Sequence, residues 1–477
     1  MTGSDQTLAA IATGRFGYGA RPGELAAAAS DARGWLTAQL DRQAAAPAEL
    51  AGLAPGAEIL GRFLAVRAER EAARRAAAQD GADAVQQIAK RVREALVPHY
   101  LAQAAARTRI ALGSPASFRE RLVQFWTNHF AVSVDKPICL GTAGALENEA
   151  IRPRVCGRFT DLLLAVETHP AMITYLDNQQ SVGPNSELGA RANRRRLIGG
   201  GAPRARAGLN ENLAREILEL HTLGVDGGYS QGDVTSFAAV LTGWSIGGGQ
   251  GRRAQGAPGT FQFRAALHEP GARTVLGRRY AEGGFGQGEA VLRDLAAQPA
   301  TARHLAVKLA RHFVADEPPP ALVERLTQAY RAADGDLPTV YAALVGWDGA
   351  WEPVPQKFKT PSDFVYSSLR ALGLVPQEPK ALLAGFEALG QRHYSPGSPA
   401  GWPDRAQDWD GADALMKRIE WSVALADRVG NAHSALATLD AALGPLGGEH
   451  TRTALARAAS GSQALALMLM SPDFQRR

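Results

Sequence analysis

Residues 210–224 constrain the fold most, because helical periodicity, a start signal and a stop signal coincide there. Asn210 or Asn212 can cap the start of a helix, and Gly224 can end it. Four apolar side chains recur at the spacing of one helix face: Leu209, Leu213, Ile217 and Leu220. The sequence therefore predicts an amphipathic helix over this stretch.

Glu216 is the carboxylate that this periodicity sets against the core. A rotation of roughly 100° per residue puts Glu216 beside the apolar stripe, with Asn212 and Glu219 on the same flank. Asn210 and His221 fall on the opposite flank. We expect Glu216 to be partly buried and therefore paired, hydrogen-bonded or shifted in pKa. The candidate partners are a histidine from another helix, Arg303, Lys308 and Arg311.

The other charges of the helix have a simpler interpretation. Glu211, Arg215 and Glu219 follow one another at i, i+4 steps, a solvated ladder worth roughly 0.2–0.5 kcal/mol per pair. Glu219 and His221 point in nearly opposite directions, so this helix alone cannot hold a metal ion as the two-histidine zinc helix does.

The composition is that of a globular chain. At 477 residues it is long enough for two or three domains, with 45% hydrophobic and 21% charged residues. No apolar run approaches the roughly 20 residues of a membrane span. The first twenty residues lack the features of a signal peptide, so we expect a cytoplasmic protein, or a periplasmic one if it is exported with a partner. Cys139 and Cys156 are expected to be buried free thiols.

The net charge of +5 includes a cluster of arginines in a stretch rich in glycine and alanine. We interpret this stretch as a mobile loop that attracts anions. No aromatic residues alternate with the arginines, so nucleic acid is not expected as a partner. The arginines are Arg191, Arg194, Arg195, Arg196, Arg204 and Arg206.

The predicted fold class is mainly α, a multi-helix orthogonal bundle with one small β-hairpin. Strand signals occur at residues 260–263 and 274–276, which we expect to pair with each other. Residues 59–112 are rich in Ala, Arg, Glu and Gln and predict a long helical hairpin or a bent helix, interrupted near Gly81. The expected division is an N-terminal helical arm (1–112), a core helical domain with the hairpin near 260–276 (113–347) and a C-terminal helical region packed on the core (348–477).

Short motifs spread over nearly the whole chain resemble those of one large bacterial family. In chain order they are FWTNHF (125–130), HPAM (169–172), YLDN (175–178), residues 210–224, GW (243–244), His268, PATA (299–302), KFKTP (357–361), GWP (401–403) and SPDFQRR (471–477). The chain resembles the family filed as domain of unknown function number eighteen hundred. The resemblance implies no established activity. It does imply a link to a second family that resembles sulfatases, so a sulfatase-like protein is a candidate partner.

The candidate site consists of polar residues that stand in apolar surroundings. Paired carboxylates could act as acid and base on a glycosidic bond. Oxygen ligands could hold a divalent cation, and histidines with carboxylates could hold a transition metal. A serine hydrolase is not expected, because no Gly-x-Ser-x-Gly motif follows a strand. The expected catalytic residues are Glu216, His129 and Asp177, and the expected binding residues are Asn128, Asn178, Asn210, Asn212, Arg215, His221 and His268.

Two functions remain open from the sequence. The first is a ligand-binding protein or enzyme with a pocket around Glu216, His129 and Asp177, for an anionic or sugar-like substrate. The second is a noncatalytic helical scaffold that docks or accompanies a sulfatase-like partner. The same polar residues could be structural, since Asn and Asp at helix starts are usually caps. Convergence of the three side chains in one cleft favours the first function, and dispersal favours the second.

Overall fold

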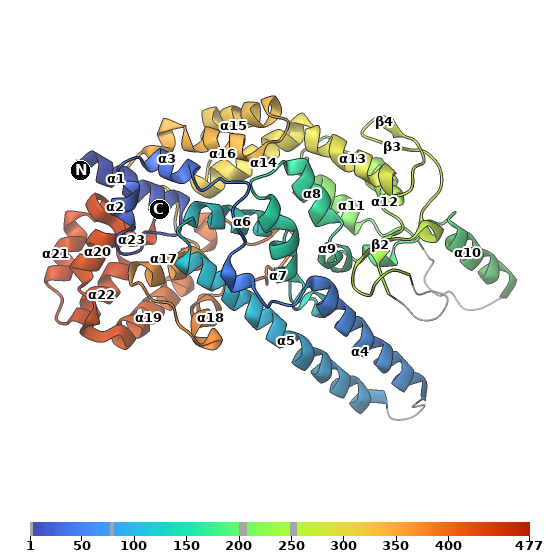
Figure 1. Cartoon of the computed structure of the whole chain (residues 1–477), viewed down its shortest axis with the longest axis horizontal. Coiled ribbons are helices and arrows are strands. Elements are labelled where there is room, and N and C mark those ends of the chain that lie inside the picture. The colour runs from blue at the N-terminus through green and yellow to red at the C-terminus, as the bar shows by residue number, and fades with distance from the viewer. Residues whose placement is uncertain (1–2, 77–80, 200–207, 249–254) are drawn as a thin grey trace.

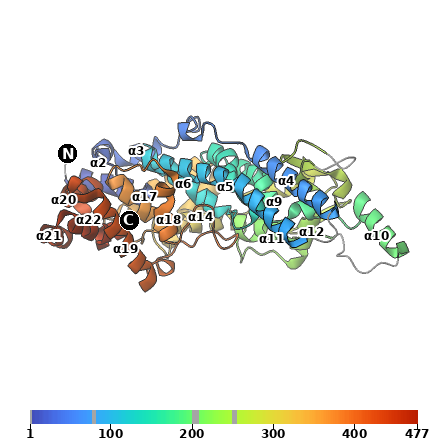
Figure 2. The same ribbon diagram turned by 90° about the horizontal axis from the view of Figure 1, so that it is seen from below.

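The computed structural model describes residues 3–76, 81–199, 208–248 and 255–477. Most of these residues are helical, so the prediction of a mainly α fold with a small β component is confirmed. The molecule is elongated in two perpendicular views, with α20 (Ala435–Leu443) to α22 (Gly461–Met470) at one end and α10 (Glu187–Gly199) at the other (Figures 1 and 2).

An antiparallel helical hairpin projects from the body in Figure 1. It consists of α4 (Gly56–Ala76) and α5 (Gly81–Gly113), which pack against each other. Alanine and long charged residues, which favour helices, dominate both segments. The prediction of a helical hairpin over residues 59–112 is confirmed.

The N-terminal and central helices form the body of the molecule. Three short helices, α1 (Gly3–Ile11), α2 (Glu24–Ala28) and α3 (Ala32–Thr37), precede the hairpin. The central helices are α6 (Ser117–His129), α7 (Ala143–Leu146), α8 (Phe159–Glu167), α9 (Pro170–Tyr175), α11 (Asn212–Glu216), α12 (Gln231–Val240), α13 (Phe285–Ala297), α14 (Pro299–Phe313), α15 (Pro320–Ala332) and α16 (Leu337–Val345).

The C-terminal helices gather at the end of the molecule that also holds α1 and α2 (Figure 1). They are α17 (Pro361–Ala371), α18 (Pro379–Ala388), α19 (Ala412–Val429), α20, α21 (Glu449–Ala456), α22 and α23 (Pro472–Gln475). Proline stands at the first position of α17, α18 and α23, where its missing N–H costs nothing.

Two large clusters of buried side chains, and a small one around Ala9 and Ala28, stabilise the described part of the fold. The larger of the two joins residues from α1 and α3 to the central helices, around Phe118, Trp126 and Phe159. The second is formed mainly by α17 to α23, with Phe364 and Leu469 at its centre, and also contains Ala105 and Leu112 of α5. The division at residues 112 and 347 stays a proposal, since buried residues of the predicted arm belong to both large clusters.

Two strands of the described chain occur where they were predicted, but each pairs with a strand that was not predicted. β2 (Phe261–Phe263) pairs with β1 (Trp244–Ile246), and β3 (Arg273–Val275) pairs with β4 (Arg278–Tyr280), in both cases antiparallel. The predicted pairing of 260–263 with 274–276 is therefore wrong. Leu276 and Gly277 both have positive φ, 49° and 74°, the backbone of a two-residue hairpin turn that closes β3 on β4.

The predicted helix at 210–224 begins as α11 and continues as a π-helical turn, Ile217–His221. The Oδ1 atom of Asn210 accepts a hydrogen bond from the backbone N–H of Asn212 at 2.9 Å, which supports the predicted start. A π-helical turn has i to i+5 hydrogen bonds and so shifts the phase of the side chains. As a result Leu218 and His221 face the core, while Leu220 is only partly buried.

The described part of the arginine-rich stretch is helical up to Gly199, contrary to its interpretation as a loop. Residues up to Gly199 form α10, in which Arg191 pairs with Glu187 one turn earlier at 2.9 Å. Arg204 and Arg206 lie outside the described residues. Within the described ranges, none of the helices is long and apolar enough to cross a bilayer. Cys139 and Cys156 are buried free thiols, as predicted.

Candidate functional site

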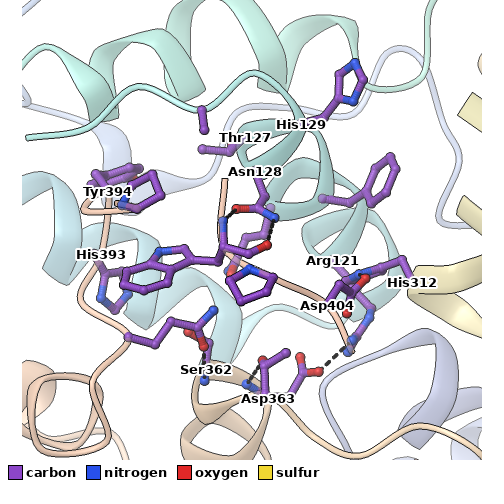
Figure 3. Close-up of a pocket in the computed structure, with 18 of the residues that line it drawn as sticks. Arg121, Thr127, Asn128, His129, His312, Ser362, Asp363, His393, Tyr394 and Asp404 are labelled. Carbon is purple, nitrogen blue, oxygen red and sulfur yellow. Dashed lines mark hydrogen bonds and ion pairs between the residues drawn. The ribbon is translucent and has the colours of Figure 1, made fainter. Parts of the chain in front are cut away.

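A cavity of about 360 Å³ lies between α6, α14, the start of α17 and the loop of residues 391–405. We refer to it as the central cavity (Figure 3). Its lining combines aromatic rings with charged and amide side chains. Its lining includes Gln124, Phe125, Asn128, His129, Lys308, Arg311, His312, Ser362, Tyr394, Trp402 and Asp404.

Asn128, at the end of α6, holds the loop that closes one side of the central cavity. Its Nδ2 atom donates to the carbonyl oxygen of Trp402 at 2.9 Å, and its Oδ1 atom accepts from the N–H of Trp402 at 2.7 Å. Gly401 has a φ of 85°, and a Cβ atom there would lie 2.3 Å from the carbonyl oxygen of Asn128. Only glycine allows this approach. Both ends of the Asn128 amide are therefore used to position the loop.

His129 is the second predicted site residue in the central cavity. The side chain is buried, and Nε2 lies 3.1 Å from the carbonyl oxygen of His221. A carbonyl can only accept a hydrogen bond, so Nε2 carries the proton. Burial holds the pKa of His129 well below its usual value, and Lys308 adds to this effect. His129 is therefore neutral, and no described residue bonds to its bare Nδ1 atom.

His312 and Asp404 form a hydrogen-bonded pair, with Nδ1 of His312 2.8 Å from Oδ2 of Asp404. Burial lowers the pKa of His312 to about 4. Burial alone would raise the pKa of Asp404, but attraction and hydrogen bonding to His312 and the charge of Lys357 lower it to about 2. At neutral pH the pair thus consists of a neutral imidazole that donates to a carboxylate.

Lys308 lies one helical turn before His312 on α14. Among the described residues its ammonium group has neither a hydrogen bond nor an ion pair. Burial lowers the pKa of Lys308 to about 8, while the charge of Asp404 raises it and that of Arg311 lowers it. Within the described residues, Arg311 bonds only the carbonyl oxygen of Asp316, at 3.2 Å. Lys308 and Arg311 therefore bring positive charge to the central cavity without an ion-pair partner in the described chain.

The loop opposite α14 carries backbone strain. Tyr394 has a φ of 54°, a conformation that costs a bulky residue on the order of 1–3 kcal/mol. Its hydroxyl donates to Oε1 of the buried Glu147 at 3.2 Å, and the guanidinium of Arg107 lies 4.8 Å from its ring centroid. Glu147 is itself paired with Arg107 at 3.2 Å. These contacts hold Tyr394 in place despite the strain.

A comparison with family models shows to which protein family the chain belongs. The model described as protein of unknown function (DUF1800) matches residues 11–476. The chain belongs to the DUF1800 family. No curated protein and no solved structure matches it.

The predicted trio of this DUF1800 member does not meet in the central cavity, because only His129 lines it. Asp177 lies at a groove beneath the α4–α5 hairpin, and its Oδ2 atom pairs with Nζ of Lys136 at 2.7 Å. Asp177 has a φ of 58°, which aspartate tolerates better than most residues.

Glu216 is half-buried, as predicted, but forms no ion pair with Arg303, Lys308 or Arg311 in the described part of the chain. Burial raises its pKa, with added repulsion from Glu219 and Glu167, while His221 and Arg215 lower it. His221 is paired instead with Glu167, at 2.8 Å from Nδ1 to Oε1. The expected partners of Glu216 are therefore wrong.

Most of the predicted binding residues have structural contacts in this DUF1800 chain. The side-chain amide of Asn178 donates to the carbonyls of Leu241 and Trp244, and that of Asn210 donates to the carbonyls of Leu176 and Asp177. Nδ1 of His268 lies 2.9 Å from the carbonyl oxygen of Thr242.

The remaining two binding residues lie at the surface of α11. Arg215 pairs with Glu211 at 3.1 Å in the predicted ladder, and Asn212 is exposed. In the described ranges, no three His, Cys, Asp or Glu side chains lie close enough to hold a metal ion.

Sequence reasoning missed Lys308, His312, Asp404 and Trp402 as members of a site. Lys308 and His312 stand at i, i+4 and so share one face of α14, a signal that was available. Trp402 belongs to a motif shared with the DUF1800 family. Asp404 carries no local signal, because its partner His312 lies 92 residues away in the chain.

Proposed function

We propose that this DUF1800 protein binds a small anionic, sugar-like ligand in the central cavity, with Lys308 as the contact for the anionic group. The volume of about 360 Å³ lies at the lower end of small-molecule sites, which span roughly 300–1,000 Å³. The proposal concerns binding. His312 and Asp404 have the arrangement of a general base, but Nε2 of His312 is shielded from solvent.

The observation that carries the proposal is the unpaired ammonium of Lys308. Lys308 is partly buried, and a charge that is withdrawn from water is normally paired or neutralised, because the loss of hydration is costly. Lys308 has a lowered pKa of about 8, yet it remains mostly protonated at neutral pH. Arg311, three residues later, adds a second cation whose only bond in the described chain goes to a backbone carbonyl. An anionic group between them would offset both charges.

The remaining walls suit a ligand with hydroxyl groups and an apolar face. Trp402 and Tyr394 supply aromatic surface. Ser362 presents a hydroxyl, and the Oε1 atom of Gln124 an acceptor, neither of which bonds to another described residue, although Nε2 of Gln124 donates to Tyr366 at 3.4 Å. A sugar ring could stack on Trp402 and exchange hydrogen bonds with these groups.

Ligand titration monitored by calorimetry and by thermal unfolding tests the proposal. The ligands are sugar phosphates, sugar sulfates and uronates, each compared with its neutral parent sugar at constant ionic strength. An anionic sugar at one hundred times its Kd should stabilise the fold by about 2.7 kcal/mol. Lys308→Met should lose this effect, and Arg303→Gln, at an exposed position of the same helix, should keep it. Equal binding of neutral sugars, or unchanged binding by Lys308→Met, would contradict the proposal.

The scaffold function is a second candidate, supported by a groove of about 1,420 Å³ beneath the α4–α5 hairpin. Its floor is apolar, with Val97, Leu101 and Phe386, and exposed basic residues Arg93 and Lys380 border it. This surface suits an acidic amphipathic segment, and the family resemblance suggests a sulfatase-like protein as its source. Co-purification with such a partner should be lost in the double variant R93E/K380E. Retained co-purification would exclude the groove as the docking surface.

A further inference from the structure

We propose that a second, smaller cavity binds a tetrahedral oxyanion, that is, a phosphate or sulfate group. This cavity has a volume of about 60 Å³ and lies among α1, residues 353–359 and the C-terminal residues 473–477. A water molecule takes about 30 Å³ in the liquid, so the space suits one small ion and excludes a sugar ring. The inference does not depend on the function proposed for the central cavity.

The lining of this small cavity is mainly apolar, apart from Ser367, Asp473 and a concentration of cations. Apolar and glycine residues such as Ile11, Gly14, Pro355 and Leu446 form most of its walls. Four basic residues line it: Arg15, Lys359, Arg476 and Arg477. Arg15, Lys359 and Arg477 are each at most 5% exposed, whereas Arg476 is exposed at the rim.

Lys359 is the residue that most clearly lacks an anion. Only 4% of its surface is exposed, and its ammonium group forms no hydrogen bond or ion pair with another described residue. Its Nζ atom lies 3.9 Å from the ring centroid of Phe474. Burial lowers its pKa to about 7; Asp363 raises it, while Arg477 and Arg418 lower it further.

Lys357 provides a comparison within the same extended segment. The segment bonds to residues 475–477 through the N–H groups of Lys357 and Lys359, so the two lysines stand two residues apart on one strand-like stretch. Lys357 is as deeply buried as Lys359, but its ammonium contacts Asp316 and the carbonyl oxygen of Asp404. The protein therefore pairs one buried lysine fully and leaves the other facing a cavity.

The two buried arginines of the small cavity, Arg15 and Arg477, add positive charge that is not matched by an equal number of carboxylates. Arg15 donates only to backbone carbonyls, those of Ala350, Glu352 and Val354, and its Nε atom has no partner in the described chain. Arg477 donates from Nε to Oδ2 of Asp363 at 2.9 Å, but that oxygen also accepts from Arg121 at 2.9 Å.

The acidic residue of the lining, Asp473, is engaged elsewhere. Its Oδ2 atom accepts hydrogen bonds from the N–H of Gly448 at 2.8 Å and from the hydroxyl of Thr451 at 2.7 Å, at the start of α21. It forms no ion pair with the described cations. Three buried cations around one small, mainly apolar space, with the single shared side-chain carboxylate of Asp363, leave a charge excess that an oxyanion would offset.

Thermal unfolding of the full chain tests this inference, with 0–20 mM phosphate or sulfate replacing chloride at constant ionic strength. The wild type should show a saturable rise in Tm with either ion. In Lys359→Met the rise in Tm should be at least tenfold smaller. This variant should fold normally, since the substitution removes a buried charge that has no ion-pair partner. Lys357→Met should melt at a lower temperature but keep the response. Lys308→Met should also keep it, which separates this site from the central cavity.

Two outcomes would overturn the proposal. The first is no saturable change in the Tm of the wild type in phosphate or sulfate, a measurement that needs no variant. The second is a response of equal size in Lys359→Met, which would indicate the general stabilisation that these salts give by exclusion from protein surfaces. A response to only one of the two ions supports the site and identifies which group it prefers.

Discussion

Nδ1 of His312 donates a hydrogen bond to Oδ2 of Asp404 at 2.8 Å, which joins α14 to the loop of residues 391–405. In this bond the imidazole donates from Nδ1 and the carboxylate of Asp404 accepts. Because burial lowers the pKa of His312 to about 4, the neutral form persists to well below pH 6. The same holds for His304, whose pKa burial also lowers to about 4.

The first prediction concerns acid stability. The pKa of His312 is about 4 in the folded protein and about 6.5 in an unfolded chain, so between these values the unfolded chain binds more protons. The free energy of unfolding should therefore fall as the pH drops from about 6.5 to about 4, with His312 contributing at most about 3 kcal/mol. Urea titrations at pH 7, 6 and 5 measure this.

His312→Asn is the variant that isolates this contribution. The asparagine amide can still donate to Asp404 but does not titrate. The loss of stability on acidification should be smaller in this variant than in the wild type. An identical pH dependence would show that His312 does not contribute.

The second prediction concerns Glu216, whose pKa is raised by burial. A carboxyl group whose pKa is higher in the folded than in the unfolded chain destabilises the fold when it is ionised. An amide in its place carries no charge and avoids this cost. Glu216→Gln should leave the fold intact or stabilise it by up to about 1 kcal/mol, because no described residue forms an ion pair with it. Glu167→Gln is the matched control, since it breaks the buried pair with His221. A large loss in Glu216→Gln, equal to that of the control, would contradict the prediction.

The third prediction concerns the loop held by Asn128. Asn128→Ala removes two hydrogen bonds to the backbone of Trp402, which should cost about 1–3 kcal/mol. Amide hydrogen exchange in residues 391–405 should become faster. Asn212→Ala, at an exposed position, should change stability by less than about 0.5 kcal/mol. Unchanged exchange in the loop would mean that Asn128 does not hold it.

The fourth prediction concerns Glu147, which is fully buried. Its carboxylate forms ion pairs with Arg107 and Arg152 and accepts hydrogen bonds from Thr127 and Tyr394. Glu147→Gln leaves the guanidinium of Arg107 without its carboxylate, while Arg152 keeps Glu120, and should cost about 3–5 kcal/mol. Asp348→Asn, which removes a highly exposed partner of Arg33, should have little effect. Similar melting temperatures for both variants would show that the buried network contributes nothing.

The sequence by itself was sufficient for features that depend on local periodicity. The α4–α5 hairpin and the helix that begins at Asn212 follow from the spacing of apolar and helix-favouring residues. The strand segments at 261–263 and 273–275 were also visible, but their partners were not. Trp244–Ile246 follows closely on the apolar helix α12, and Arg278–Tyr280 begins with two exposed arginines, so neither stood out as a strand.

Only the tertiary structure decided which polar residues meet. Asn128 and His129 were expected at a site and do line the central cavity, whereas Glu216 and Asp177 point elsewhere. Lys308 and His312 share one face of α14 but were not identified as site residues, and Asp404 carries no local signal because its partner His312 lies 92 residues away. Periodicity shows which face of a helix is buried. What that face meets depends on the packing of distant helices, and that packing leaves Lys308 and Lys359 without an ion-pair partner in the described chain.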